Sequence, residues 1–83
     1  MWRLLVKEKL LKIMASVLEL DESMIDSSTS PETVAEWDSL RHMKLVVALE
    51  EEFEVEFTDD QITEMLSPEL ILVTLNEAGA SAG

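Results

Sequence analysis

The stretch Trp37-Asp38-Ser39-Leu40 decides how this sequence is interpreted, because the chain changes character there. A polar segment, Ser27 to Pro31, lies shortly before it, and the run from Leu40 to Phe53 that follows contains no Gly or Pro. Apolar residues in this run fall on two separate helical faces, one more than a helix that packs on a core needs. We therefore expect Ser39, whose hydroxyl lies beside the surplus apolar face, to be an attachment point.

The two apolar faces of this run have different predicted roles. A neighbouring helix or a partner protein could cover the second face, and its position beside a single polar group favours a partner. Met is suited to varied partners because its side chain is flexible. The expected core face is Leu45, Val46, Leu49 and Phe53. The expected partner face is Leu40, Met43 and Val47, flanked by Arg41, Lys44 and Glu51.

A first helix is predicted from Trp2 to Leu18, where apolar residues recur at intervals of three and four. Residues 19–38 then form a long connection with local turns. Asp21 is expected to cap one such turn, which returns Met24 and Ile25 to the core. The expected core positions of the first helix are Val6, Leu10, Ile13, Met14 and Val17. Ser30-Pro31-Glu32 is typical of a second short turn.

The rest of the chain predicts three more helices. The second runs from Ser39 to about Glu54, capped by Asp38 or by Ser39 itself. Thr58-Asp59-Asp60-Gln61 matches the capping-box pattern of a short third helix. This helix carries Ile62, Met65 and Leu66. Ser67 and Pro68 open a fourth helix, Glu69 to about Ala78, with an apolar surface of Leu70, Ile71, Leu72, Val73 and Leu75. Residues 54–57 alternate like a strand, but a lone strand has no partner, so we expect a loop.

The predicted fold is all-α: a small four-helix bundle with three main helices, one short third helix and a long loop between the first and second. Residues 1–78 form one domain, and residues 79–83, which begin at Gly79, are expected to be a flexible tail.

Composition excludes several classes of function. The chain has 83 residues, no Cys and a net charge of -12. This acidity repels nucleic acids and anionic membranes and attracts partners with basic patches. Charged residues interrupt the apolar start of the chain, so neither a signal peptide nor a membrane insertion is expected. A cytoplasmic monomer is the expected state.

Catalysis and metal binding receive little support from the residues. Ser39 has a histidine three residues on, His42, but no third group to orient the ring, and a helix cap is the commoner role for such a Ser. His42 is expected to be a partly buried structural residue. The acidic pairs lack the ordered spacing of a calcium loop, and no Gly-rich phosphate loop is present. We expect neither an enzyme nor a metal site.

Asp38-Ser39-Leu40, followed by Leu45-Val46-Val47-Ala48-Leu49-Glu50-Glu51-Glu52-Phe53, resembles the acyl carrier protein family. The resemblance covers most of the chain, because the helix order, the long loop and the Glu56-to-Asp60 segment also match. It implies that Ser39 carries 4'-phosphopantetheine, added from coenzyme A by a phosphopantetheinyl transferase. The terminal thiol of that group would hold an acyl or aminoacyl group as a thioester.

The resemblance also implies partners. These are the transferase, an acyl- or aminoacyl-loading enzyme, and a downstream acyltransferase or synthase with a basic docking surface. Leu40, Met43 and Val47 match positions where such carriers meet their partners, and we expect the neighbouring Asp38, Arg41, Lys44 and Glu51 to contact the partners as well. Glu36-Trp37 before Asp38, and the bases Arg41 and Lys44, depart from the fatty-acid-synthesis type and indicate a specialised member. The alternative is an acidic helical adaptor that binds a basic partner without a prosthetic group.

Overall fold

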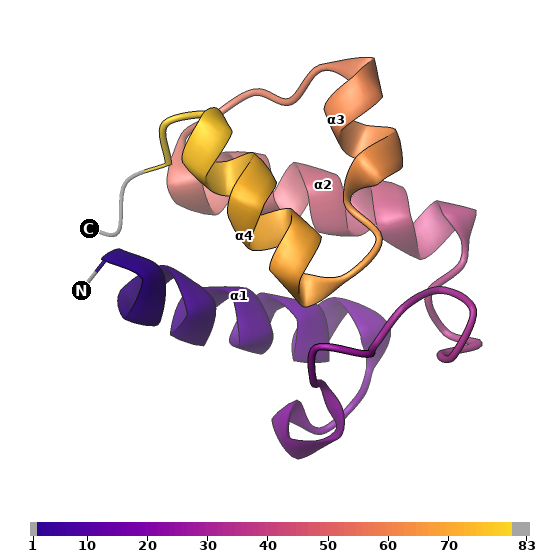
Figure 1. Cartoon of the computed structure of the whole chain (residues 1–83). Helices are drawn as coiled ribbons and strands as arrows, with labels where there is room; N and C mark the ends of the chain where they lie inside the picture. The colour runs from indigo at the N-terminus through magenta and orange to yellow at the C-terminus, as the bar shows by residue number, and fades with distance from the viewer. Residues whose placement is uncertain (1, 81–83) are drawn as a thin grey trace.

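The computed structural model describes residues 2–80, which form four α-helices (Figure 1). The helices are α1 (Trp2–Leu18), α2 (Ser39–Phe53), α3 (Asp59–Glu64) and α4 (Pro68–Glu77), with a 3-10 turn η1 (Glu22–Met24) in the first loop. No strand occurs within residues 2–80, and residues 54–57 form a loop before α3. The predicted all-α bundle, with a short third helix and a long first loop, is confirmed.

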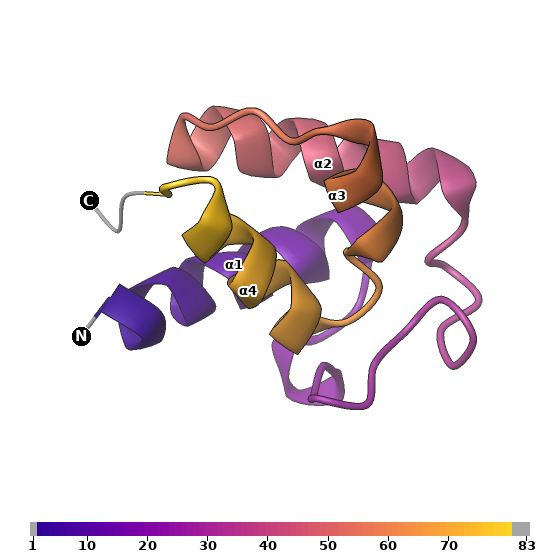
Figure 2. The ribbon, with the colours of Figure 1, turned by 45° about the horizontal axis from the view of Figure 1, so that its top comes forward.

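The two long helices α1 and α2 lie side by side and run in opposite directions, as Figures 1 and 2 both show. The long loop joins them at one end of the molecule, where α1 ends and α2 begins. α4 runs obliquely to this pair and packs on α1, and α3 packs on α4. The start of α2 is therefore surrounded by the long loop and α3, at the end of the molecule opposite the first turn of α1.

The core lies where α1, α2 and α4 meet. α1 contributes a residue at every fourth position, as expected from the helical repeat, while Ile13 and Val17 are only partly buried at its edge. All four predicted core residues of α2 are buried. The buried hydrophobic residues of these three helices are Val6, Leu10, Met14, Leu18, Leu45, Val46, Leu49, Phe53, Ile71, Leu72 and Leu75, and α4 also buries Pro68 and Thr74.

The prediction that Met24 returns to the core is wrong, and some apolar residues of the third and fourth helices are exposed as well. Met24 is 61% exposed, although the neighbouring Ile25 is buried, because a turn of three residues directs only part of its side chains inward. Leu66, Leu70 and Val73 are also exposed, whereas Met65 is buried. α4 has a core on one side only, so its continuous apolar run cannot be buried all round.

The helix starts follow the predicted capping chemistry at three of four places. The Asp38 carboxylate accepts a hydrogen bond from the Arg41 N–H at 2.9 Å, which identifies Asp38 rather than Ser39 as the cap of α2. Thr58 and Gln61 form both halves of a capping box. Ser67 caps α4. The side chain of Asp21, in contrast, makes no cap hydrogen bond to η1.

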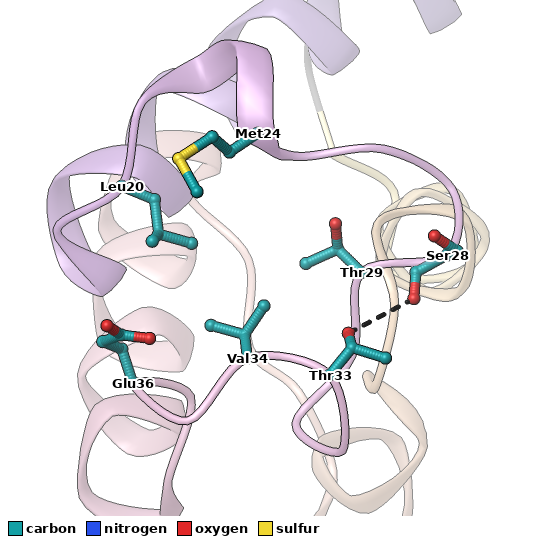
Figure 3. Close-up of a pocket in the computed structure, with 7 residues that line it drawn as sticks. All are labelled: Leu20, Met24, Ser28, Thr29, Thr33, Val34 and Glu36. Atoms are coloured by element: carbon teal, nitrogen blue, oxygen red, sulfur yellow. Dashed lines mark hydrogen bonds between the residues drawn. The ribbon is translucent and has the colours of Figure 1, made fainter.

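The long loop is ordered by its own polar side chains. The Asp26 carboxylate accepts hydrogen bonds from the hydroxyl and the backbone N–H of Ser28. These bonds, the hydroxyl bond foremost, lower the pKa of Asp26 below its usual range. Figure 3 shows a pocket inside this loop, with Leu20 and Val34 on its walls and a hydrogen bond from the Thr33 hydroxyl to the Ser28 carbonyl. None of the residues that line it is among the predicted site residues.

The first and last described residues, 2 and 80, meet at the end of the bundle that lies away from the start of α2 (Figure 1). The Trp2 indole N–H donates to the Ala80 carbonyl at 2.8 Å, and Ala80 is buried. Gly79, with φ of 81°, turns the chain after α4. Ala80 thus packs against the bundle, although we placed it in the tail; residues 81–83 of that tail lie outside the described residues. Among the described helices, none is long and apolar enough to cross a membrane.

Candidate functional site

Ser39 is the first residue of α2, and its side chain is exposed. Because Asp38 supplies the cap oxygen, the fold does not need the Ser39 hydroxyl for that purpose. α2 is 15 residues long, and the unpaired N–H groups and positive dipole end of a helix start favour a phosphate ester there. The site therefore combines an accessible nucleophilic oxygen with a local field that suits a phosphodiester.

A shallow pocket opens directly beside this hydroxyl. The long loop contributes Pro31 and Trp37 to it, and the segment after α3 contributes Leu66. We call it the Ser39 pocket, and its lining is Pro31, Trp37, Asp38, Ser39, His42 and Leu66. A group attached to Ser39 would have mostly apolar surface next to it.

Trp37, His42 and Ile62 are joined by two hydrogen bonds at the edge of this pocket. The Trp37 indole N–H donates to His42 Nδ1 at 3.0 Å, and His42 Nε2 lies 2.7 Å from the backbone carbonyl of Ile62 in α3. An indole can only donate and a carbonyl can only accept, so the ring carries its proton on Nε2. The chain of bonds fixes the neutral tautomer of His42 and links the loop, α2 and α3.

This arrangement removes the base that Ser-His chemistry would require. Both ring nitrogens of His42 are engaged by partners other than Ser39. The expectation that His42 is a partly buried structural residue is confirmed. Trp37 is 2% exposed, which confirms that it packs beneath the loop and leaves little of it for a partner to contact.

The predicted partner face of α2 is exposed as expected. Leu40, Met43 and Val47 are 66%, 47% and 49% exposed. Together with Lys44, Ala48 and Glu51 they line a shallow depression, which we call the α2 groove. Five of the seven predicted partner residues thus share one surface, which begins one residue after Ser39. A sixth, Asp38, borders Ser39 itself.

Arg41 is placed differently from the other predicted partner residues. Its guanidinium donates to the Val17 carbonyl at 3.1 Å and pairs with the Glu19 carboxylate at 2.7 Å. Val17 O is one of the carbonyls that the end of α1 leaves without a helical partner. Arg41 therefore joins the end of α1 to the start of α2, and Lys44 is the base that remains in the α2 groove.

Part of the acidic run at the end of α2 also has a structural role. The Glu50 carboxylate accepts a hydrogen bond from the Phe57 N–H at 2.9 Å, and Glu52 pairs with Lys9 of α1 at 3.8 Å. Glu51, in contrast, lies in the α2 groove. The run is not only a solvated face.

Sequence reasoning missed three contributors to the site. Pro31 was assigned to a turn and Leu66 to the third helix, and the role of Ile62 comes from its backbone carbonyl, which no side-chain pattern reveals. The exposure of Leu66 could have been suspected from its place just before Ser67-Pro68, because a residue between two short helices has no continuous face to share. Within residues 2–80 no cluster of three or more His or acidic residues could hold a metal ion.

The fold and the Ser39 region define the class as a small helical carrier domain. A family model described as a phosphopantetheine attachment site matches residues 8–71. That range is most of the chain and includes α2, so the chain belongs to the phosphopantetheine attachment site family. Domains of this family are the attachment site for covalently bound 4'-phosphopantetheine and are typically carriers without catalysis of their own. The resemblance to acyl carrier proteins is confirmed at the level of the family.

Proposed function

We propose that Ser39 carries the phosphopantetheine and that the protein presents an acyl or aminoacyl thioester on it to partner enzymes. The observation that supports this most directly is the exposed Ser39 hydroxyl at the start of a long helix. Asp38 caps that helix, so the Ser39 hydroxyl is not needed as a cap. The residues present fit the group, because the helix start suits the phosphate and the Ser39 pocket offers room beside it.

The attachment reaction needs only this hydroxyl from the chain. The Ser39 oxygen forms a bond to the phosphorus that bears the pantetheine, and the pyrophosphate bond of coenzyme A breaks. Adenosine 3',5'-bisphosphate leaves, and the hydroxyl proton passes to the transferase or to solvent. When bound, the group supplies the thiol that this Cys-free chain lacks. Asp38 holds the helix start, and Ser39 with it, in a fixed place.

The α2 groove is the surface that we assign to the partners of the carrier. Its centre is apolar, with one base, Lys44, and one acid, Glu51, on its sides. A partner that inserts an apolar side chain and offers charges of both signs would fit this surface. The partners are a phosphopantetheinyl transferase, an acyl- or aminoacyl-loading enzyme and a downstream acyltransferase or synthase. The setting that we propose is a biosynthetic pathway in the cytoplasm, in which the carrier acts as a monomer.

Intact-mass measurement tests this proposal. Wild-type protein incubated with coenzyme A, Mg²⁺ and a promiscuous phosphopantetheinyl transferase should gain one phosphopantetheine unit, and Ser39→Ala should gain none. Ser23→Ala, which removes an exposed hydroxyl from η1, is the matched control and should be modified like wild type. Wild-type protein that stays unmodified would contradict the proposal.

The same variants address the alternative, an acidic adaptor without a prosthetic group. If the protein were such an adaptor, Ser39→Ala would leave partner binding and pathway activity intact. The carrier proposal expects Ser39→Ala to abolish pathway activity while the protein remains folded, which far-UV circular dichroism would check.

A further inference from the structure

The Ser39 pocket has a closed inner wall. Trp37, 2% exposed, and the partly buried His42 form it, with ring centroids 6.1 Å apart and planes inclined by 30°. Their polar atoms are already paired, the indole N–H with His42 and His42 Nε2 with the Ile62 carbonyl. The polar groups of the wall are therefore used to hold it together, and the buried Trp37 ring offers little surface to a ligand.

The hydrogen-bonded His42 side chain lies between the start of α2 and the backbone of α3, next to Ser39. His42 is three residues after Ser39, and its ring reaches from the first turn of α2 to the backbone of α3. Breaking the chain would leave the Trp37 indole N–H and the ring nitrogens of His42 unpaired in a partly buried place, which is costly. A group attached at Ser39 could pass between the two helices only by breaking these hydrogen bonds.

The interior behind this wall is tightly packed. The side chains that follow on the core face of α2, Leu45 and Leu49, have no exposed surface, and neither has Met65 at the end of α3. A side chain with no exposed surface is surrounded by other protein atoms, so an inserted aliphatic chain would have to displace it.

We propose that the Trp37–His42–Ile62 chain of hydrogen bonds keeps the cargo of Ser39 outside the bundle, and that the cargo is a short or polar acyl group. This inference rests on the proposed function. A long aliphatic cargo would remain in water on such a carrier, with only the shallow Ser39 pocket to cover it. A short or polar cargo has little apolar surface to hide and is freely accessible to the partner enzymes.

Thermal unfolding of loaded wild-type protein tests this proposal. The transferase attaches acyl-phosphopantetheine from acetyl, butyryl, hexanoyl and octanoyl coenzyme A, and intact mass verifies each product. The melting temperature should be the same for all four forms and for the form without an acyl group. A melting temperature that rises with chain length would overturn the proposal, because a chain that binds inside the native state stabilises it. Absence of any modification would instead contradict the proposed attachment at Ser39.

His42→Ala removes the link between the loop, α2 and α3 and should change this result. Its melting temperature should rise stepwise from the acetyl to the octanoyl form, because the opened space can accept the chain. A flat response in folded His42→Ala protein would also overturn the proposal. Thr63→Ala, which alters an exposed residue next to Ile62, is the matched control and should respond like wild type.

The two indole N–H signals give a second measurement that does not depend on a variant. In NMR spectra of the wild-type protein, the Trp37 N–H should stay protected from exchange with solvent by its bond to His42 in both the acetyl and the octanoyl forms. Trp2, which donates to Ala80 at the far end of the bundle, provides the internal reference. A Trp37 N–H that loses this protection in the octanoyl form, while Trp2 is unaffected, would show that the bond to His42 has opened and would contradict the proposal.

Discussion

The two apolar stripes of α2 consist of similar side chains but differ in what they contact. The inner stripe, Leu45, Val46, Leu49 and Phe53, is buried against the rest of the bundle. The outer stripe, Leu40, Met43 and Val47, is exposed in the α2 groove. The fold thus places the residues that stabilise it and the partner surface that we propose on opposite sides of one helix. Substitutions on the two sides should give effects of different kinds.

The largest effect is expected on the inner stripe. The Leu49 side chain has no exposed surface, so Leu49→Ala leaves a cavity in the core. This substitution should lower the free energy of unfolding by about 2–5 kcal/mol. Urea unfolding followed by circular dichroism measures this loss. A loss below about 1 kcal/mol would mean that the bundle collapses around the cavity and that the inner stripe is less important to the fold than its burial indicates.

Val47→Glu on the outer stripe should have the opposite profile. Its free energy of unfolding should stay within about 0.5 kcal/mol of wild type, because the side chain is half exposed. Placing a charge in the apolar centre of the α2 groove should lower kcat/KM for the phosphopantetheinyl transferase by about tenfold, or about 1.4 kcal/mol. Ser23→Glu adds the same charge on η1 and should leave the transferase rate near wild type. An unfolded Val47→Glu protein would show that the outer stripe belongs to the core.

Arg41 and Lys44, the two bases beside the outer stripe, make different contacts, so their substitutions should differ in the same way as those of the two stripes. Arg41→Ala loses the bonds to Val17 and Glu19 and should cost about 1 kcal/mol of stability. Lys44→Ala, in the α2 groove, should change stability by less than about 0.5 kcal/mol but slow the transferase if partner acids contact it. Equal stabilities of the two variants in urea unfolding would refute the structural role of Arg41.

The smallest effect is expected where α2 ends, outside both stripes. Glu54 has φ of 53°, a left-handed conformation that favours Gly. Glu54→Gly should therefore raise the free energy of unfolding by about 0.5–1 kcal/mol without altering the transferase rate. Glu19, with φ of 57°, has the same conformation but pairs with Arg41, so Glu19→Gly should gain less. A larger gain at Glu19 would mean that the ion pair contributes nothing, as is common for exposed pairs.

Much of the fold could be predicted because the local signals in the sequence agree with one another. The Trp2–Leu18 repeat, the Thr58–Gln61 capping box and the Ser67-Pro68 pair each mark a helix boundary through short-range chemistry. The exposure of Met24, Leu70 and Val73, which the sequence did not reveal, has a common origin. An apolar residue in a short turn or on a uniformly apolar helix carries no sign of which side meets the core, and only tertiary packing decides it.

The candidate site was predictable in part for a similar reason. The α2 groove depends on the spacing of residues along one helix, so sequence alone identified five of its six lining residues. The inward contacts of Arg41 and the link from His42 to Ile62 join segments about 20 or more positions apart. No periodic pattern within one segment contains that information, because it arises from how α1 and α3 are placed around the start of α2.

The hydrogen bond between Trp2 and Ala80 determines which side of the protein faces a surface or a fusion partner when the protein is immobilised. It holds both ends of the described chain together at the side of the bundle away from the first turn of α2 (Figure 1). A surface, a fluorescent label or a second protein joined near residue 2 or residue 80 would therefore leave Ser39 facing free solution. The domain can thus be immobilised near these residues while the start of α2 stays accessible to enzymes.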